Sequence, residues 1–274
     1  MMILTKTIIR SLLKPRDPVS HKGTHGHALI IAGNKGRMGA AVIAARACLR
    51  AGAGLLTVNV PKEERSILQR TIPEAMLLMR EENKYDINNF SAIGIGPAIG
   101  TDKKAEKLLS NIISKCKKPL IIDADALNIL SKNKKLFDKV PVQTILTPHE
   151  KEFDRLFGVH KNTKERMNTT IRKAKEKNIV IVLKGHKTLI TFNGRSFINT
   201  AGNAGLAKGG SGDALTGIIT AFLAQGYEPF NAALLGVYMH GLAADIALKD
   251  QSSESMLISD VIECLGEAFK KVLR

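Results

Sequence analysis

The sequence predicts an α/β protein, a three-layer α/β/α domain with a mostly parallel central sheet. Two observations carry this prediction. Short apolar segments rich in Ile, Val and Leu alternate with longer helical patterns, which is typical of parallel strands covered by helices on both faces. The 274 residues are also 44% hydrophobic, enough for one large core. Because no linker, repeat or low-complexity stretch interrupts the pattern, we expect a single domain over residues 1–274.

The first half of the chain is expected to hold three strands and two long helices. His27–Gly33 is an apolar strand, and Met38–Gly52 is a helix with an Ala-rich packing face that ends at glycine. Leu55–Pro61 is a second strand, closed by its proline. Ser91–Gly100 runs from a strand into a glycine-rich loop, and Thr101–Cys116 is helical.

The second half continues the alternation and then becomes helical. Pro119–Leu127 is a continuous apolar strand with acidic residues at its end, and Gln143–Glu150 is a strand followed by helices up to Lys177. Asn178–Gly185 is another buried strand, and Thr188–Asn199 is a hairpin with an Asn-Gly turn. The remaining chain predicts helices at 211–225, 230–249 and 259–273.

The formal charge of +16 raises the question of nucleic-acid binding. The lysines argue against it, because they are dispersed over a helix near 103–118 and a loop near 132–139, with few aromatic residues for base stacking. No zinc-finger spacing or RNA-binding aromatic signature occurs. We expect a basic, solvated surface that helps attract a polyanionic small molecule, and no specific nucleic-acid partner.

The cysteines and the N-terminal segment indicate a cytoplasmic protein without membrane association. Cys48, Cys116 and Cys264 are far apart and form no CxxC, as expected for small buried residues in a reducing compartment. The apolar opening, MMILTKTIIRSLL, is too short to span a membrane, and no small-residue cleavage site follows it.

The stretch NAGLAKGGSGD lies between the hairpin and an apolar helix. Gly209, Gly210 and Gly212 leave the backbone free to adopt positive φ, and Ser211 and Asp213 are good N-cap residues. Such a turn directs unpaired N–H groups and the positive end of a helix dipole at one point, as in an anion site. There the aspartate can take a proton from a hydroxyl or bind magnesium. The other interpretation is a glycine-rich helix start with a capping aspartate, and the residues leave both open.

Charged residues end two predicted strands, at the edge of the sheet where ligands of such folds bind. Asp123 and Asp125 close one strand, and we expect the turn to send their carboxylates in different directions. Asp123 can orient a metal or a substrate hydroxyl, or serve as an N-cap. Lys184 ends another strand and can contact a phosphate.

His149 follows a proline at a third strand end. It can donate to a ligand oxygen or shuttle a proton, or it can cap the next helix. Glu150 and Glu152 can bind magnesium directly or through water, although glutamates in a first turn also suit the helix dipole.

Three common motifs are absent or incomplete. Gly94–Gly100 reads GxGPxxG, and its late third glycine and the intervening proline argue against a hydride-transfer Rossmann site. No GxxxxGK(S/T) occurs, which excludes a Walker-type P-loop. His25 and His27 have no carboxylate or thiolate at metal-ligand spacing, so we predict no metal there.

Seven segments of the chain match one known family in order, from about His21 to the C-terminus. They are HKGTHGHALIIAG, GRMGAAVIAARACLRAGAG, GIGPAIG, IIDADALNIL, ILTPHEKEF, VLKGHKT and NTAGNAGLAKGGSGDALTGII. These segments resemble the ADP-dependent NAD(P)H-hydrate dehydratases, which repair hydrated NADH and NADPH. The resemblance implies a ribokinase-like fold, in agreement with the α/β/α prediction.

The resemblance implies roles for individual residues. Asp213 is similar to the residue that faces the hydrated nicotinamide nucleotide and would be the catalytic base. Ala98 stands where the family commonly has the last glycine of GPG, and its methyl group would narrow the space for a backbone contact. The implied substrate contacts are Ala40, Ala98, His149 and Asp213. The implied nucleotide contacts are Lys184, Gly185, His186, Lys187, Thr188, Gly209, Gly210 and Gly212.

The resemblance also implies the chemistry. ADP or ATP is the expected co-substrate, with Mg²⁺ bridging its phosphates. Phosphoryl transfer would turn the ring hydroxyl into a leaving group, and elimination would restore the dihydropyridine and release AMP and phosphate. About twenty residues precede His21, so we expect a stand-alone dehydratase for the S form, without the epimerase domain of many relatives. A homotetramer is implied, and the helix from Met38 and the C-terminal helices are the expected contact surfaces.

Two other functions stay open. The leading alternative is a ribokinase-like kinase of a small alcohol, such as a vitamin precursor, since this fold hosts both reactions. The second is a non-catalytic nucleotide-binding module, and Asp213 beside the glycine-rich turn argues against it. Consumption of ADP only in the presence of hydrated NADH would separate the three functions.

Overall fold

A ten-stranded sheet organises the computed structural model, which describes residues 1–82 and 85–274. The strand order is β1-β10-β9-β8-β7-β6-β5-β2-β3-β4. The seven strands from β8 to β4 in this order are mutually parallel, β9 is antiparallel to both neighbours, and β1 is parallel to β10. The prediction of a mostly parallel sheet is confirmed. The strands are β1 (Met2–Ile3), β2 (His27–Ile31), β3 (Leu55–Val60), β4 (Met76–Met79), β5 (Ala92–Ile95), β6 (Leu120–Ile122), β7 (Ile145–Leu146), β8 (Val180–Leu183), β9 (Thr188–Phe192) and β10 (Arg195–Asn199).

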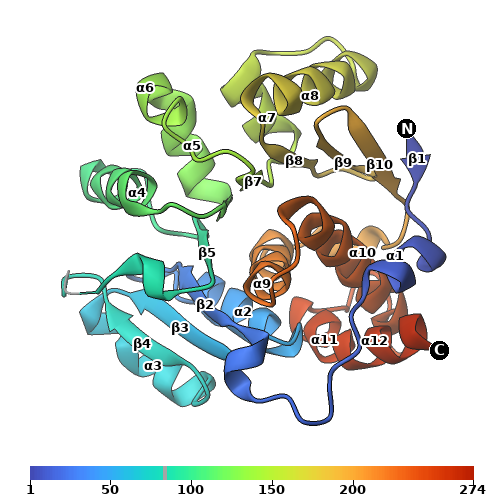
Figure 1. Cartoon of the computed structure of the whole chain (residues 1–274), viewed down its shortest axis with the longest axis horizontal. Coiled ribbons are helices and arrows are strands. Elements are labelled where there is room, and N and C mark those ends of the chain that lie inside the picture. Colours follow the sequence, from blue (N-terminus) through green and yellow to red (C-terminus); the bar gives the residue numbers. More distant parts are fainter. Residues whose placement is uncertain (83–84) are drawn as a thin grey trace.

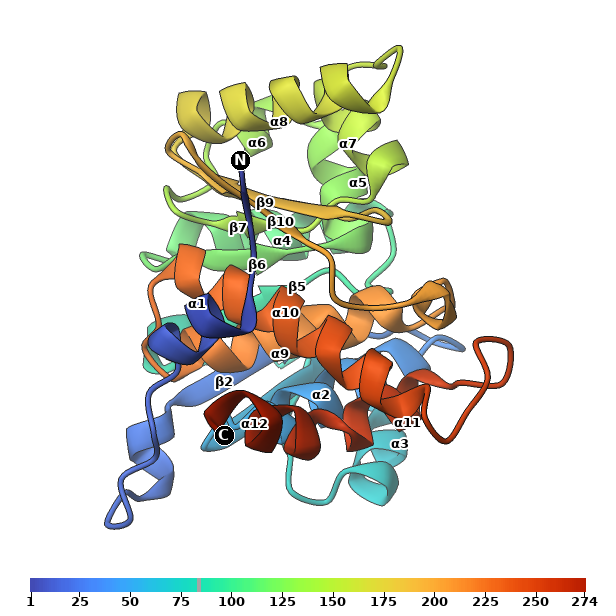
Figure 2. The same ribbon diagram turned by 90° about the vertical axis from the view of Figure 1, so that its right-hand side faces the viewer.

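Helices cover both faces of this sheet (Figure 1). One layer holds α4, α5, α7 and α8, and the other holds α2, α9 and α10, with α11 and α12 outside them (Figure 2). The helices are α1 (Lys6–Leu12), α2 (Gly39–Arg50), α3 (Arg65–Thr71), α4 (Lys103–Lys115), α5 (Ala124–Lys132), α6 (Lys134–Phe137), α7 (Glu150–Phe157), α8 (Thr163–Lys177), α9 (Ser211–Ala224), α10 (Pro229–Ala247), α11 (Ile258–Glu263) and α12 (Leu265–Leu273). In the part of the chain that is described, no helix has the length and hydrophobicity needed to cross a membrane.

The central strands are apolar on both sides because each face meets a separate core. In β2, Ala28 and Ile30 belong to the core with α2, α9 and α10. The alternate residues Leu29 and Ile31 belong to the core with α4, α5 and α8. Successive side chains of a strand point to opposite faces, so a continuous apolar run is what this position requires.

The α2 and α9 backbones touch. A Cβ added at Gly217 of α9 would lie 2.1 Å from the carbonyl oxygen of Ala44 in α2, so only glycine fits there. The Ala-rich face of α2, which includes Ala41, Ala44 and Ala45, is buried against α9. This face is therefore covered within the chain, so only the other sides of α2 remain for the expected contact with other subunits.

Most predicted elements are confirmed, with three differences. The strand predicted over Pro119–Leu127 is shorter, because β6 ends at Ile122 and α5 begins at Ala124. The expected helix 259–273 is divided into α11 and α12 by a turn at Cys264, and Gly266, a weak helix former, follows the break. The strands β1 and β4 were not predicted, because they are short and lie at or near the sheet edges. The hairpin turn is confirmed, since Asn193 and Gly194 have φ values of 44° and 81°.

Candidate active site

The carboxyl ends of the parallel strands meet at one edge of the sheet and bring the predicted loops together. Asp123 follows β6, and His149 and Lys184 lie beyond β7 and β8, where they form an isolated parallel bridge. The start of α9 reaches the same edge, since Gly212 would place a Cβ 3.3 Å from the Lys184 Nζ. The expectation that these loops are neighbours is confirmed.

A cavity of about 810 Å³ opens at this edge. Most of the predicted nucleotide contacts line it, together with the predicted base. The predicted residues in its wall are Asp213, His149, Lys184, Gly185, His186, Thr188 and Gly212, whereas Ala40, Ala98, Lys187, Gly209 and Gly210 are not among its lining residues.

The turn before α9 differs from the prediction in its geometry. Of the three glycines, only Gly210 has a positive φ, 94°, and it is the N-cap residue. Ser211 and Asp213 are the first and third residues of the helix, so neither is the cap. The N–H of Ser211 donates to the Lys208 carbonyl. Across the described residues, the N–H groups of Gly209, Gly210, Gly212 and Asp213 have no acceptor, which leaves four donors for an anion.

Asp123 is engaged within the protein. Its side chain is 1% exposed, and its two oxygens accept from the Lys184 Nζ at 2.9 Å and from the Thr216 hydroxyl at 2.8 Å. Asp123 is the N-cap residue of α5, as one interpretation proposed, but its side chain makes no capping hydrogen bond. Asp125 turns away and accepts from the Gly100 N–H at 2.9 Å, which confirms that the two carboxylates diverge.

Asp213 differs from Asp123 and Asp125, the other two aspartates of this edge, in its hydrogen bonding. Its side chain makes no hydrogen bond to any described residue, although it lines the cavity. Burial, helped by the nearby Asp123 carboxylate, raises the pKa of Asp213 to about 6, while the Lys184 ammonium acts in the opposite direction. A carboxylate with this pKa can both accept and release a proton near neutral pH.

His149 is the N-cap of α7, which confirms the interpretation of this residue as a helix cap. Its Nδ1 accepts from the N–H groups of Lys151 and Glu152, at 3.1 and 3.3 Å. This places the proton on Nε2, which lies 3.5 Å from a Glu152 oxygen. Burial lowers the His149 pKa, so the ring is a neutral N–H donor at the wall of the cavity.

The predicted magnesium and metal ligands serve other purposes in this fold. Glu152 completes the α7 capping box, and Glu150 lies 3.5 Å from the Arg166 guanidinium. The His25 ring bonds to the Ser20 hydroxyl and the His27 ring to the Thr57 hydroxyl. The described residues contain no group of three or more His, Cys, Asp or Glu side chains able to hold a metal ion.

Neither of the two alanines predicted to contact substrate lines the cavity. Ala98 follows Pro97, whose carbonyl accepts from the Gly33 N–H at 2.8 Å, so its loop rests on the loop that leads to Ala40 in α2. A Cβ at Gly96 would lie 1.8 Å from the Asp123 carbonyl oxygen. The Ala98 loop is therefore packed against the cavity wall without lining it.

Ala98→Gly is expected to leave the free energy of unfolding unchanged or to raise it by up to about 1 kcal/mol. The sequence alone predicts a loss, because glycine adds entropy to the unfolded chain. The structure reverses the expected sign: Ala98 has a φ of 53°, which is strained for a residue with a Cβ. Thermal unfolding tests this, with Ala75→Gly, at a loop residue without positive φ, as the matched control that should lose stability. A comparable loss of stability in both variants would show that the backbone of Ala98 is not strained.

The sequence did not reveal two polar residues of the cavity wall, Asn199 and His240. Asn199 is the last residue of a predicted hairpin, and His240 is one histidine in an otherwise apolar helix. Neither position shows a recognisable motif. The one signal that could have indicated a role for His240 in the site is that this polar residue stands among apolar residues.

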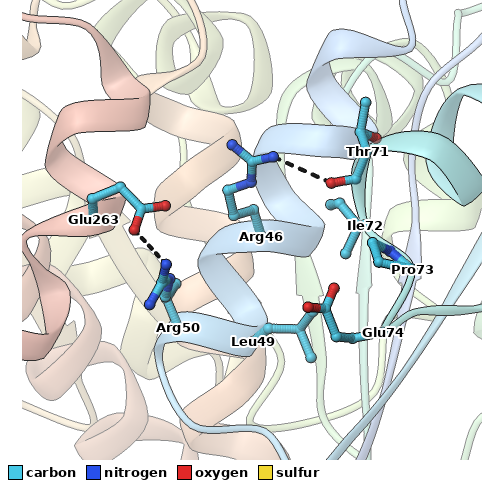
Figure 3. A pocket seen from close by; sticks show the side chains of 8 residues that line it. All are labelled: Arg46, Leu49, Arg50, Thr71, Ile72, Pro73, Glu74 and Glu263. Carbon is cyan, nitrogen blue, oxygen red and sulfur yellow. Dashed lines mark hydrogen bonds and ion pairs between the residues drawn. The ribbon is translucent and has the colours of Figure 1, made fainter.

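A second hollow, of about 520 Å³, lies between α2, α11 and the segment that joins α3 to β4 (Figure 3). Within it Arg50 pairs with Glu263, and Arg46 donates to the Thr71 carbonyl at 3.2 Å. It contains none of the predicted site residues, and its arginines already have partners.

The fold is that of ribokinase-like proteins. A solved structure of a ribokinase-like superfamily protein from Enterococcus faecalis has a TM-score of 0.90 and 31% identity, covering 99% of this chain and 96% of its own. Within that class the chain belongs to the NAD(P)H-hydrate dehydratase family, whose model matches residues 28–266.

Individual relatives agree with this assignment. The ADP-dependent (S)-NAD(P)H-hydrate dehydratase of Bacillus subtilis is 33% identical over 275 residues, 97% of each chain. A crystal structure of ADP/ATP-dependent NAD(P)H-hydrate dehydratase from the same organism, co-crystallised with ATP and Mg²⁺, has a TM-score of 0.90 at 32% identity and covers 99% of this chain and 98% of its own. The bifunctional NAD(P)H-hydrate repair enzyme of Moorella thermoacetica is 34% identical over 279 residues, 96% of this chain and 53% of its own. The chain thus spans about half the length of the bifunctional relatives it matches.

Proposed function

We propose that this chain is an ADP-dependent dehydratase of the S form of hydrated NADH and NADPH, with residues 1–274 acting as one dehydratase domain. The observation that carries the proposal is the start of α9. There the Asp213 carboxylate stands beside four N–H donors, and neither it nor they have a partner among the described residues of this member of the NAD(P)H-hydrate dehydratase family. A carboxylate next to an anion site is unfavourable unless it has a chemical role.

In the first step Asp213 takes the proton of the hydroxyl on the hydrated ring. The freed oxygen forms a bond to the terminal phosphorus of ADP, and the bond from that phosphorus to AMP breaks. The N–H groups of Gly212 and its neighbours, with the Lys184 ammonium, stabilise the charge on the transferred phosphoryl group.

In the second step the ring loses its new phosphate. The carbon–oxygen bond breaks, the phosphate leaves with the electron pair, and a proton is lost from the neighbouring carbon as the double bond forms. This restores the dihydropyridine and yields AMP and phosphate. The hydroxyl itself is a poor leaving group, which explains the need for a phosphoryl donor.

Mg²⁺ would fit this site when it is bound together with the nucleotide. The ion usually keeps several waters and binds through substrate phosphates with one or two carboxylates, so the lack of a three-residue cluster among the described residues is compatible with it. When bound, it would neutralise phosphate charge. Both oxygens of Asp123 are already engaged, so the phosphates would supply most of its ligands.

The proposed contacts divide between two sides of the site. The nucleotide side is the Lys184–Thr188 segment and the Gly209–Gly212 turn, and the substrate side is Ala40, Ala98 and His149. As a neutral N–H donor, His149 is suited to a ligand oxygen. We place the enzyme in the cytoplasm, as a homotetramer without nucleic-acid partners.

The proposal is tested by incubating the protein with hydrated NADH and with ADP, ATP or no nucleotide. We expect the absorbance of the dihydropyridine band to return only when a nucleotide is present. Nucleotide consumption is followed in parallel without hydrate. Steady ADP or ATP consumption with a small alcohol, and none with hydrate, would instead identify a kinase.

A further inference from the structure

Arg80 connects the ends of three neighbouring strands at the edge of the sheet where the site lies. It follows β4, and its N–H donates to the Val60 carbonyl at 2.9 Å. Its guanidinium reaches past β3 to the end of β2, where Nη1 donates to the Gly33 carbonyl and Nη2 to the Ala32 carbonyl, both at 3.0 Å. Further bonds of 3.2 Å run from Nε to Asn59 Oδ1 and from Nη2 to the Asn59 carbonyl. One side chain thus joins β4, β3 and the loop that follows β2.

The acceptors show why an arginine is used at this position. β2 ends at Ile31, so the Ala32 and Gly33 carbonyls lie beyond its ladder and need other donors. All four acceptors are uncharged oxygen atoms. A planar guanidinium with five donors can reach several such atoms at once, whereas a lysine ammonium is a compact point charge. The geometry of the Arg80 side chain is therefore what these bonds use.

Gly33 links Arg80 to both loops of the substrate side. Its carbonyl accepts from Arg80, and its N–H donates to the carbonyl of Pro97, the residue before Ala98, at 2.8 Å. The chain turns at Gly33, which has a φ of 75°, and leads into α2, whose second residue is Ala40. The positions of Ala40 and Ala98 therefore both depend on where Arg80 holds Gly33.

The nucleotide side of the site is held by other bonds. There Asp123 accepts from Lys184 and Thr216, which connects the ends of β6 and β8 with α9. None of the Arg80 acceptors belongs to these elements. The two sides are thus anchored separately, so a change at Arg80 should affect one ligand and spare the other.

We propose that Arg80 is a positioning residue for the hydrated nucleotide and acts through the loops that carry Ala40 and Ala98. This inference rests on the proposed function, which assigns these two alanines to the substrate side. The bonds of Arg80 order both loops before the substrate arrives, so less conformational freedom is lost on binding. Without the guanidinium, three carbonyl groups lose this donor, and the loop after β2 is released from β3 and β4.

The test is Arg80→Met in the full chain, with steady-state kinetics on hydrated NADH and calorimetric binding of ADP. We expect the KM for hydrated NADH to rise about tenfold, with a smaller change in kcat, which is the signature of lost substrate binding. The ADP dissociation constant should stay at the parental value. Arg46→Met is the matched control, because Arg46 is also half-buried and its guanidinium also donates to a backbone carbonyl, that of Thr71, outside the site. It should keep the parental KM.

Arg80→Lys separates the geometry of the side chain from its charge. Lysine keeps the charge but cannot reach all the acceptors, so KM should stay raised, although less than in the methionine variant. A lysine variant with the parental KM, an equal rise in Arg46→Met, or a parallel loss of ADP affinity in Arg80→Met overturns the inference. A parent chain that does not convert hydrated NADH overturns the proposed function instead. Should the methionine variant not fold, the KM and the ADP affinity of the lysine variant decide.

Discussion

Asp213→Asn is expected to lower turnover at least about a hundredfold and to leave ADP affinity largely intact. Asparagine keeps the size of the side chain but cannot accept the hydroxyl proton, and loss of a general base typically costs this much. The N–H groups at the start of α9 that lack an acceptor among the described residues stay in place, so the donors proposed for the phosphates are kept. The measurements are the rate of dihydropyridine recovery and calorimetric binding of ADP.

The matched control is Asp260→Asn, since Asp260 is the third residue of α11, as Asp213 is of α9. It should retain activity. Near-normal rates in Asp213→Asn would remove the base assignment, and equal losses in both variants would show a general effect of the substitution.

The pH profile follows from the same residue. The raised pKa of Asp213, about 6, means that the base is protonated below that pH. Since a general base must be ionised, kcat/KM of the parent should fall as the pH drops through about 6. For stability the sign is opposite: burial penalises the ionised form, so the parent loses stability as the pH rises through 6, and the asparagine variant avoids this loss.

Gly212→Val is expected to weaken ADP binding more than tenfold without unfolding the protein. A Cβ at this position lies 3.3 Å from the Lys184 Nζ and 3.6 Å from an Asp123 oxygen, so the two methyl groups of valine would enter the space beside that ion pair. The sequence suggests positive φ as a further obstacle, but Gly212 lies in helical backbone. Crowding at the phosphate site is the remaining cause. Calorimetry with ADP is the measurement.

Gly266→Val provides the comparison. Gly266 is the second residue of α12, as Gly212 is of α9, and a Cβ there meets nothing within 4 Å. Both variants should melt at similar temperatures, and only Gly212→Val should lose affinity. A folded Gly212→Val protein with parental ADP affinity would place the anion site elsewhere.

The features that depend on pattern were predictable from the sequence. Apolar runs located the parallel strands, and the residues at their ends located the edge where Asp123, His149 and Lys184 meet. The Asn193-Gly194 turn was also predictable, but the backbone angles of the site loops were not. The amino-acid sequence does not show that Gly210 is the residue with positive φ before α9. It also does not show that Ala98 has a positive φ, which strains its backbone.

The sequence also does not predict which side chains, far apart along the chain, form hydrogen bonds or ion pairs with one another. The Asp123 carboxylate could be a cap, a metal ligand or a salt-bridge partner, and its partners come from β8 and from α9, 61 and 93 residues away. In the sequence His240 resembles a core histidine, and only the fold shows that its Nε2 has no partner among the described residues.

The contact between Gly217 and the Ala44 carbonyl has a consequence for how the two ligands would be aligned. The helices α2 and α9 begin at the same edge, and their backbones are too close to slide or separate without losing the contact. The substrate contact proposed at Ala40 and the anion site proposed at Gly212 thus lie on two helices that are in direct backbone contact. The distance between these two positions is set when the chain folds. The substrate hydroxyl and the terminal phosphorus would therefore be aligned without a movement of α2 relative to α9. The entropic cost of this alignment would be met during folding, before either ligand binds.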